Sequence, residues 1–333
     1  MTRPGATEDV PCNLCGAAPY DIVGRVDREG GALQTVMCRA CGLVWINPRP
    51  PAGEMDRYYA TEYRADYTGD RAPRLRKILR GMRGAQDRRR ALDPLLRDRA
   101  AETSEPLHVL DVGCGAGELL YLLRRERLEV SGLEPGREYA EFARRVLGVQ
   151  VQTATVEGAL VAPASQDVVT LFHCLEHVPD PRRVLTIVRG WVKAGGAVVV
   201  EVPNVESTVQ APAHRFHYAH LYHFSGATLG ALGESAGLRC LRTFYSHDGG
   251  NVTCWFRRQD DEERRPAGLE AQAARTRAIL ATHTSLRHYL SATPYRRTLD
   301  RLRRRLHEDH LLRRLKSVDD VLRWASWPVA GGR

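Results

Sequence analysis

Four cysteines near the start of the sequence have the spacing of metal ligands. Cys12 and Cys15 belong to one Cys-x-x-Cys-Gly segment, and Cys38 and Cys41 belong to a second. A turn of this kind points two thiolates at one ion, so two turns supply the four ligands of a tetrahedral site. Because all four ligand positions are cysteine, the sequence predicts a structural zinc ion rather than a catalytic one. A redox-active cysteine pair is the main alternative, and two matched segments argue against it.

A second group of candidate residues follows an apolar, β-branched run. The segment 111–117, DVGCGAG, contains Asp111, Cys114 and three glycines at alternate positions, Gly113, Gly115 and Gly117. Glycines placed in this way let the backbone turn tightly and leave room for a ligand against the main chain. Glu134 and Pro135 end the next apolar run, where a carboxylate can accept ribose hydroxyl groups. The pattern predicts a nucleoside-containing cofactor.

Two cofactors fit this pattern, a nicotinamide dinucleotide and S-adenosylmethionine (SAM). In DVGCGAG the third glycine comes one position too early for the dinucleotide motif Gly-x-Gly-x-x-Gly. Asp111 would repel a pyrophosphate, whereas it would attract the ammonium group of SAM. The sequence therefore favours SAM, and a purely structural turn is the remaining alternative.

Residues 107–257 resemble class I SAM-dependent methyltransferases. The resemblance rests on DVGCGAG and on the segment 172–181, FHCLEHVPDP, which is similar to a motif of a broad methyltransferase subgroup. It implies that Thr155 and Val156 frame the adenine, although many relatives have Asp where this chain has Thr155. It also implies that His173 lies beside the methionine part of SAM. Glu176 and His177 fit either packing at a helix start or direct catalysis.

A histidine-rich segment supplies the candidates for proton removal. His214, His217, His220 and His223 follow the fifth expected strand, with Tyr222 between the last two. Open α/β sheets bind ligands at this carboxyl edge. Histidine suits proton removal from a carbon or oxygen acceptor, because its pKa lies near neutral pH.

The whole chain also resembles a narrower group, the zinc-containing small-molecule methyltransferases related to sugar C-methyltransferases. The resemblance rests on the cysteine segments, on CGLVWINPRP, on the tyrosine-rich stretch with Tyr58, Tyr59, Tyr63 and Tyr67, and on HYAHLYHFS. It makes His220 the first candidate for the general base, with His223, His177 and Tyr222 as further catalytic candidates. The Glu that precedes the family's histidine is Ala219 here, so the resemblance implies a small-molecule, sugar or glycan acceptor without fixing a sugar. Helical spacing of the tyrosines favours packing, and a lid over the acceptor is the alternative.

Alternation of apolar runs and helical stretches predicts an α/β fold. Five buried strands are expected at 107–113, 129–135, 149–153, 167–172 and 197–203, and an antiparallel hairpin is expected at 238–246 and 251–258. Together with the resemblance, this predicts a class I methyltransferase fold, Rossmann-like, with a mostly parallel seven-stranded sheet and an antiparallel edge hairpin. The expected domains are a zinc module (1–50), a helical, Tyr-rich and basic linker or lid (51–104), the SAM-binding domain (105–258) and a basic helical C-terminal region (259–333).

Composition limits the class of protein. Hydrophobic residues make up 43% of the 333 residues and charged residues 27%, as in ordinary globular proteins. No apolar run is long enough for a membrane span and the first residues do not resemble a signal peptide, so we expect a cytoplasmic protein. The net charge of +9 is concentrated at 70–99 and 296–316. Solvated helix faces are the ordinary explanation, and contact with anionic lipid, a phosphorylated substrate or RNA is the alternative.

Three classes of function remain open at this point. A SAM-dependent methyltransferase acting on a small-molecule, sugar or glycan acceptor, by C- or O-methylation, is favoured. An RNA methyltransferase is the second, although EVPN at 201–204 stands where amino-directed enzymes have an NPPY-like segment. A non-catalytic SAM-binding or interaction protein is the third. We expect the C-terminal tail to pack on the core or on a second subunit of a homodimer.

Overall fold

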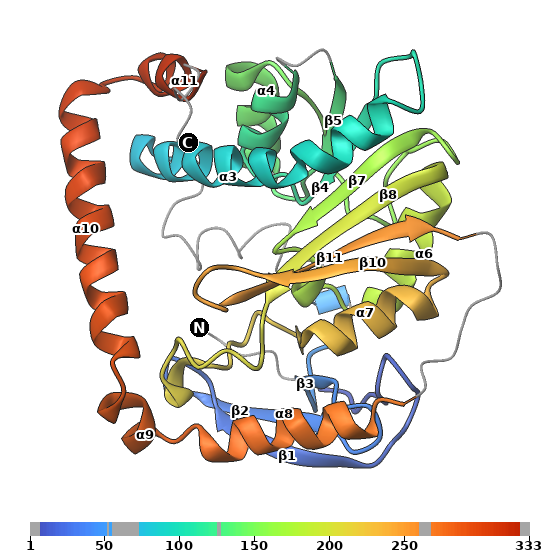
Figure 1. The fold of residues 1–333 in the computed structure, drawn as a ribbon, viewed down its shortest axis with the longest axis vertical. Coiled ribbons are helices and arrows are strands. Elements are labelled where there is room, and N and C mark those ends of the chain that lie inside the picture. The colour runs from blue at the N-terminus through green and yellow to red at the C-terminus, as the bar shows by residue number, and fades with distance from the viewer. Residues whose placement is uncertain (1–6, 52, 55–72, 125–127, 260–267, 327–333) are drawn as a thin grey trace. The chain divides into compact units, whose positions relative to one another are not determined.

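The computed structural model of the chain describes residues 7–51, 53–54, 73–124, 128–259 and 268–326 (Figure 1). The chain forms two compact units. The first unit comprises residues 1–58, 161–165 and 169–297, and the second comprises 59–160, 166–168 and 298–333. The tyrosines expected to form a packing face or a lid, Tyr58, Tyr59, Tyr63 and Tyr67, lie outside the described residues.

A seven-stranded sheet has the order β10-β11-β8-β7-β4-β5-β6. Its strands are β4 (His108–Val112), β5 (Glu129–Leu133), β6 (Gln150–Gln152), β7 (Gln166–Phe172), β8 (Val192–Pro203), β10 (Leu238–Tyr245) and β11 (Asn251–Arg258). β5 pairs in parallel with β4 and β6, whereas β11 pairs antiparallel with β8 and β10. This confirms the predicted Rossmann-like fold of class I methyltransferases, with its antiparallel hairpin at one edge.

Burial explains why the central strands lack polar alternation. In β7 the six residues from Asp167 to Phe172 are all buried, and Val198 to Val200 of β8 are at most 1% exposed. Strands covered on both faces read as continuous apolar runs. Asp167 is a buried polar residue of β7, and its carboxylate accepts hydrogen bonds from the His108 backbone N–H at 2.9 Å and from Arg99 Nε at 3.1 Å. Asp167 therefore ties the end of the long helix α3 (Leu75–Ala100) to β4.

Helices of the second unit surround its strands. They include α4 (Glu118–Arg124), α5 (Arg137–Phe142), the π-helix η1 (Ala143–Leu147) and α11 (Val318–Ser326). α3 contacts α4 and α11 through an apolar face that includes Ile78 and Met82, both at most 1% exposed. Gln86 Nε2 of α3 donates to the Ala325 carbonyl of α11 at 3.0 Å. Segments far apart in the sequence thus form one core.

The first unit contains a four-stranded antiparallel sheet that the sequence analysis did not predict. Its order is β1 (Tyr20–Val26), β2 (Ala32–Cys38), β3 (Val44–Ile46) and β9 (Tyr222–His223). β9 comes from the histidine-rich segment, and Trp45 of β3 pairs with Tyr222 of β9. Backbone hydrogen bonding therefore joins the cysteine segments to the histidine-rich segment.

Two helices of the first unit, α6 (Pro181–Trp191) and α7 (Gly226–Ser235), begin at side chains that cap them. The unit also contains η2 (Leu175–His177), η3 (Pro212–His214), α8 (Glu270–Thr282) and α9 (Ser285–Leu290), and α10 (Thr293–Arg314) follows. The Asp180 side chain accepts from Arg183 N–H at 3.0 Å and is the N-cap of α6, directly before Pro181. Ser225 caps α7 in a capping box with Thr228. Within the described ranges, no helix has the length and apolar character needed to cross a membrane.

Candidate functional site

The glycine-rich segment forms a tight turn at the end of β4. Gly113, Gly115 and Gly117 have φ values of 72°, 58° and 83°, in the left-handed region that favours glycine. The backbone N–H groups of Gly113 and Cys114 both donate to the Leu133 carbonyl, at 2.8 and 3.0 Å. The turn therefore lies against the end of β5, which is where Glu134 begins the next loop.

Glu134 is fixed by backbone hydrogen bonds. Its side chain is buried, Oε2 accepts from Gly115 N–H at 2.9 Å and Oε1 accepts from Gly136 N–H at 3.0 Å. A carboxylate oxygen has two lone pairs, so each oxygen can accept a further hydrogen bond from a ligand. The arrangement places an oriented acceptor beside a glycine turn, as ribose recognition requires.

The other cofactor candidates of the second unit differ in how deeply they are buried. Asp111 and Val156 are buried, at 5% and 6% exposed, whereas Pro135 and Thr155 are half-buried. The Cys114 side chain packs on β5, because a Cβ atom on Gly132 would come within 2.6 Å of its sulfur. Cys114 thus contributes packing and a backbone N–H. His173, the other cofactor candidate, belongs to the first unit.

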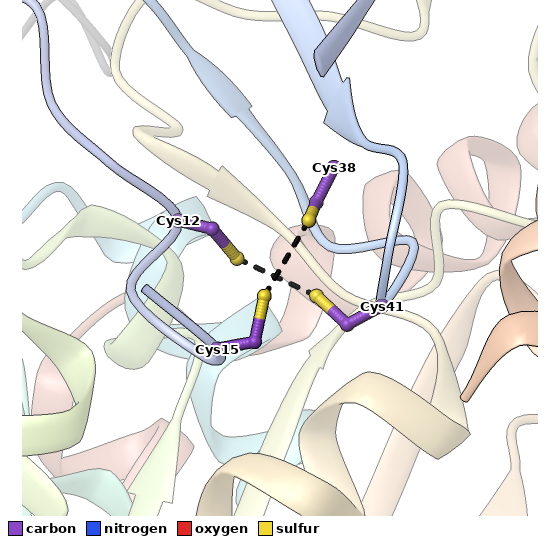
Figure 2. A group of neighbouring side chains, drawn as sticks. All are labelled: Cys12, Cys15, Cys38 and Cys41. Atoms are coloured by element: carbon purple, nitrogen blue, oxygen red, sulfur yellow. Dashed lines mark hydrogen bonds between the residues drawn. The ribbon is translucent and has the colours of Figure 1, made fainter. Parts of the chain in front are cut away.

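The four predicted cysteine ligands converge in the first unit (Figure 2). The sulfur atoms of Cys12 and Cys41 are 3.4 Å apart, those of Cys15 and Cys38 are 3.5 Å apart, and all four lie within 4.8 Å of one another. All four thiols are free. A zinc–sulfur bond of about 2.3 Å implies tetrahedral sulfur–sulfur distances of about 3.8 Å, whereas a disulfide needs about 2.05 Å. The geometry therefore fits a metal ion rather than a disulfide.

Neighbouring elements hold the cysteine turns in place. Asn13, inside the first turn, donates to Asp180 at 2.9 Å and accepts from Arg182 N–H at 3.0 Å, at the start of α6. Gly42 follows the last cysteine with φ of 78°, and a Cβ atom there would come within 2.8 Å of the Ala273 Cα atom of α8. Figure 1 shows α8 alongside β1 and β2. The glycine after the second turn is thus required both by its φ and by the close approach of a helix.

Tyr222, one of the catalytic candidates, has its hydroxyl group engaged in hydrogen bonds within the protein. It is 1% exposed, and its hydroxyl accepts from Arg49 NH1 at 2.8 Å and donates to the Pro179 carbonyl at 3.2 Å. Burial raises the pKa of Tyr222 to about 12, despite the neighbouring guanidinium. Its hydroxyl is therefore neutral and engaged in joining β9 to the segment before α6.

The histidine candidates lie together. The ring centroid of His220 is 4.9 Å from that of His177, 5.3 Å from that of His217 and 6.0 Å from that of His223. Burial lowers the pKa of His217 to about 4, that of His223 to about 3, and that of His220 well below its usual value. These imidazoles are neutral at pH 7, as a proton acceptor must be. His214 is exposed, with Nδ1 3.3 Å from the Arg28 carbonyl oxygen.

Glu176 brings a carboxylate to this cluster. It is 1% exposed, and its Oε1 lies 3.4 Å from His173 Nδ1 and 3.6 Å from His177 Nε2. Burial would raise the pKa of Glu176, but the two histidines lower it, so the carboxylate is ionised. The His177 ring is oriented by its Nδ1, which is 2.8 Å from the Ala219 carbonyl oxygen.

Glu201 is a site residue that the sequence analysis did not select. It belongs to β8, and its Oε1 lies 3.2 Å from His173 Nε2. Burial would lower the pKa of His173, but Glu176 and Glu201 raise it to about 9. His173 also has φ of 53°, and its backbone N–H donates to the Glu201 carbonyl at 2.8 Å. The acid in EVPN, at the carboxyl end of a predicted strand, was the available signal.

Comparison with known families identifies a methyltransferase domain. Residues 85–243 match the family model described as "Methyltransferase domain". The match includes the glycine turn, Glu134 and the histidine cluster, whereas the cysteine turns and the helices after α7 lie outside it. The fold is that of class I methyltransferases, and residues 85–243 are similar to a methyltransferase domain.

Curated relatives match over a shorter stretch. The ubiquinone biosynthesis O-methyltransferase of Klebsiella pneumoniae is 40% identical over 122 residues, which are 34% of this chain and 50% of that protein. The enzyme of the same name from Vibrio atlanticus is 38% identical over 122 residues, which are 34% of this chain and 52% of that protein. The chain therefore spans about half the length of the curated relatives that it matches.

Two solved structures are similar in fold. A SAM-dependent methyltransferase of Thermotoga maritima, described as a possible histamine N-methyltransferase, has a TM-score of 0.40 and 22% identity, and the alignment covers 49% of this chain and 87% of that one. The 1,6-didemethyltoxoflavin-N1-methyltransferase of Burkholderia thailandensis, solved with S-adenosylhomocysteine, has a TM-score of 0.46 and 16% identity, with 73% and 100% covered.

Proposed function

We propose that the chain is a SAM-dependent methyltransferase that acts on a small-molecule, sugar or glycan-type acceptor, at carbon or oxygen. The observation that carries the proposal is the Glu134 carboxylate, held by the N–H groups of Gly115 and Gly136 inside a matched methyltransferase domain. The names of the curated relatives, which are O-methyltransferases of ubiquinone biosynthesis, support a small acceptor and an oxygen atom.

Charge in the cofactor site favours SAM over a dinucleotide. Asp111 is the last-but-one residue of β4, directly before the glycine turn, and Glu134 follows β5. Two acids suit a ligand with an ammonium group and a ribose, because the acids attract the cation and accept from the hydroxyl groups. A pyrophosphate at the same turn would be repelled by Asp111. Asp111 is the proposed partner of the ammonium group, and Thr155 and Val156 are the proposed contacts of the adenine.

Acceptor activation is assigned to the histidine cluster. Methyl transfer is an in-line displacement, so the protein must align the acceptor with the sulfonium, and a hydroxyl or carbon acceptor must also lose a proton. His220 lies between His177, His217 and His223 and is neutral at pH 7. Proton removal is therefore expected to depend on His220. His223, 5% exposed and with no hydrogen-bond partner on Nε2 among the described residues, is the proposed acceptor contact.

A structural zinc ion is proposed at Cys12, Cys15, Cys38 and Cys41. Four thiolates leave no coordination position for a substrate. The same turns contact α6 and α8, and β3 pairs with the strand that contains His223. The ion would thus stabilise the small sheet that holds the histidine-rich segment, without taking part in the chemistry.

Transfer of a labelled methyl group tests the proposed function. Purified protein is incubated with methyl-labelled SAM and a cell extract separated into small-molecule, RNA and protein fractions. Label should enter the small-molecule fraction with the wild type and fall to background with Gly115→Val, whose side chain would occupy the ligand's path. Label in the RNA fraction alone would contradict the acceptor class, and SAM binding with no transfer to any fraction would contradict catalysis.

A further inference from the structure

Glu176, His177 and His220, here called the Glu-His-His triad, form a second group with the geometry of metal ligands. One ligand atom of each residue lies within 4.8 Å of the others. They come from two places in the sequence: η2 contains Glu176 and His177, and the histidine-rich segment contains His220. Two imidazoles and one carboxylate are the ligand set of many mononuclear sites for Zn²⁺ and similar divalent ions.

The orientation of His177 suits a metal ligand beside Glu176. Its Nδ1 lies 2.8 Å from the Ala219 carbonyl oxygen, so Nδ1 must carry the hydrogen that it donates. In the neutral ring, Nε2 then presents a lone pair toward Glu176 Oε1, 3.6 Å away. Two lone pairs facing each other are repulsive unless a proton or a metal ion lies between them. A histidine that donates its other ring N–H to a carbonyl is also the usual arrangement of a metal ligand.

The Glu176 carboxylate has the environment of a ligand without its ion. It is 1% exposed, and neither oxygen has a hydrogen-bond partner of normal geometry among the residues that the structure describes. Its distances to His173 and His177, 3.4 and 3.6 Å, are ion-pair distances rather than hydrogen bonds. A buried carboxylate without hydrogen bonds is costly, and coordination of a cation removes that cost.

We propose that the Glu-His-His triad binds a divalent transition-metal ion of the Zn²⁺ type. Three protein ligands leave at least one coordination position open, in contrast to the four-cysteine site. His223, whose ring centroid is 6.0 Å from that of His220, has an Nε2 atom without a hydrogen-bond partner among the described residues. A further imidazole thus lies next to the triad.

This proposal rests on the proposed methyltransferase function. A metal ion at the triad would help an acceptor hydroxyl to lose its proton. A bound divalent ion lowers the pKa of a coordinated hydroxyl or water. With such an ion bound, the acceptor O–H bond would break and its proton would pass to water. The acceptor oxygen forms a bond to the methyl carbon as the carbon–sulfur bond of SAM breaks, which releases S-adenosylhomocysteine. In this scheme His220 is needed as a ligand.

Metal stoichiometry tests the triad independently of activity. Purified full-length protein is washed with a chelator, its zinc is measured by elemental analysis, and Zn²⁺ is then added in a calorimetric titration. We expect about one tightly retained zinc per chain, in the four-cysteine site, and one further ion that binds in the titration. With Co²⁺ in the titration, the added ion should give visible bands without the thiolate charge-transfer band, because its ligands are nitrogen and oxygen.

Matched variants assign the second ion. Glu176→Gln and His220→Asn should each weaken its binding by at least about a hundredfold, since even indirect partners of metal ligands account for roughly 10- to 100-fold. His247→Asn, an exposed histidine between β10 and β11, is the control and should bind both ions. Circular dichroism and SAM titration of each variant show whether it is folded and whether the cofactor site is intact.

Two results would overturn the inference. One is saturation of the wild type at a single ion per chain, which would leave a proton between His177 and Glu176. The other is wild-type affinity for the second ion in both folded variants. Either result would leave SAM binding and methyl transfer untouched, so failure of the triad as a metal site is distinguishable from failure of the proposed function.

Discussion

His220 shows how one residue acquires its properties from its neighbours. Its imidazole is surrounded by three others, and burial together with these neighbours holds its pKa well below the usual histidine value. A histidine in this setting stays neutral across the physiological range, so it can accept a proton or bind a cation without first losing a proton of its own.

Replacement of His220 should separate chemistry from cofactor binding. In His220→Asn, turnover with the true acceptor should fall by roughly 10² to 10⁴, the usual contribution of positioned proton removal, while SAM affinity stays nearly unchanged. His223→Asn should cost less if that residue mainly contacts the acceptor. Steady-state kinetics and SAM calorimetry measure the two effects, and unaltered turnover in His220→Asn would rule out its role.

Many individual residues of the site could be named from sequence, because short motifs encode them. The cysteine turns, the glycine turn, Glu134 and the N-cap Asp180 depend on local backbone geometry that residue type dictates. Glu201 could not be selected in the same way. Its importance comes from its distance to His173, which depends on the neighbouring strand β8 and not on any local pattern.

At the scale of elements, the four-stranded sheet β1-β2-β3-β9 shows where local pattern fails. β9 has two residues, too few for a recognisable alternation, and its partner β3 lies far away in the sequence. The central strands β4, β7 and β8 of the seven-stranded sheet were predictable because they are compact, largely buried apolar runs. Pairing between distant segments is set by tertiary packing, so the sequence indicated the sheet that carries the cofactor turn and not the one that joins the two candidate metal sites.

Two glycines test whether α8 stabilises the cysteine turns. Gly16 and Gly42 both have positive φ, but a Cβ atom on Gly16 meets nothing within 4 Å, whereas one on Gly42 meets the α8 backbone at 2.8 Å. Gly16→Ala should lower the free energy of unfolding by about 1 to 2 kcal/mol, the cost of the left-handed conformation. Gly42→Ala should lose about 1 to 3 kcal/mol more because of overpacking. Denaturant unfolding of the zinc-loaded proteins measures both values, and equal losses would show that α8 does not press on the turn.

At the scale of the whole molecule, the basic C-terminal region contributes to both units. α8 lies against Gly42 in the first unit, and in the second unit Arg80 NH2 of α3 lies 2.7 Å from the Glu308 carboxylate of α10. Leu299, Leu302 and Leu306 of α10 are 52–60% exposed, so the described residues of the second unit leave this face largely uncovered. A second subunit as its partner stays a prediction.

The net charge of +9 is also a property of the whole chain, and the structure shows how part of it is compensated. Arg99 pairs with Asp167, and Glu308 faces Arg76 and Arg80. These basic residues of α3 therefore have structural partners, which supports the ordinary explanation of a charged helix face for part of the segment 70–99. Arg303 of α10 is exposed and lies 3.6 Å from Asp300, three residues earlier in the same helix.

Cofactor selectivity of the full chain tests the central claim most directly. In calorimetric titrations the wild type should bind SAM and S-adenosylhomocysteine and should not bind NADH. Glu134→Ala should weaken SAM binding by roughly ten- to a hundredfold, the value of a charged hydrogen bond of about 1.5 to 3 kcal/mol. Glu129→Ala, an exposed residue at the start of the same strand, should bind as the wild type does. Binding of NADH without binding of SAM, or unchanged SAM affinity in Glu134→Ala, would contradict the account.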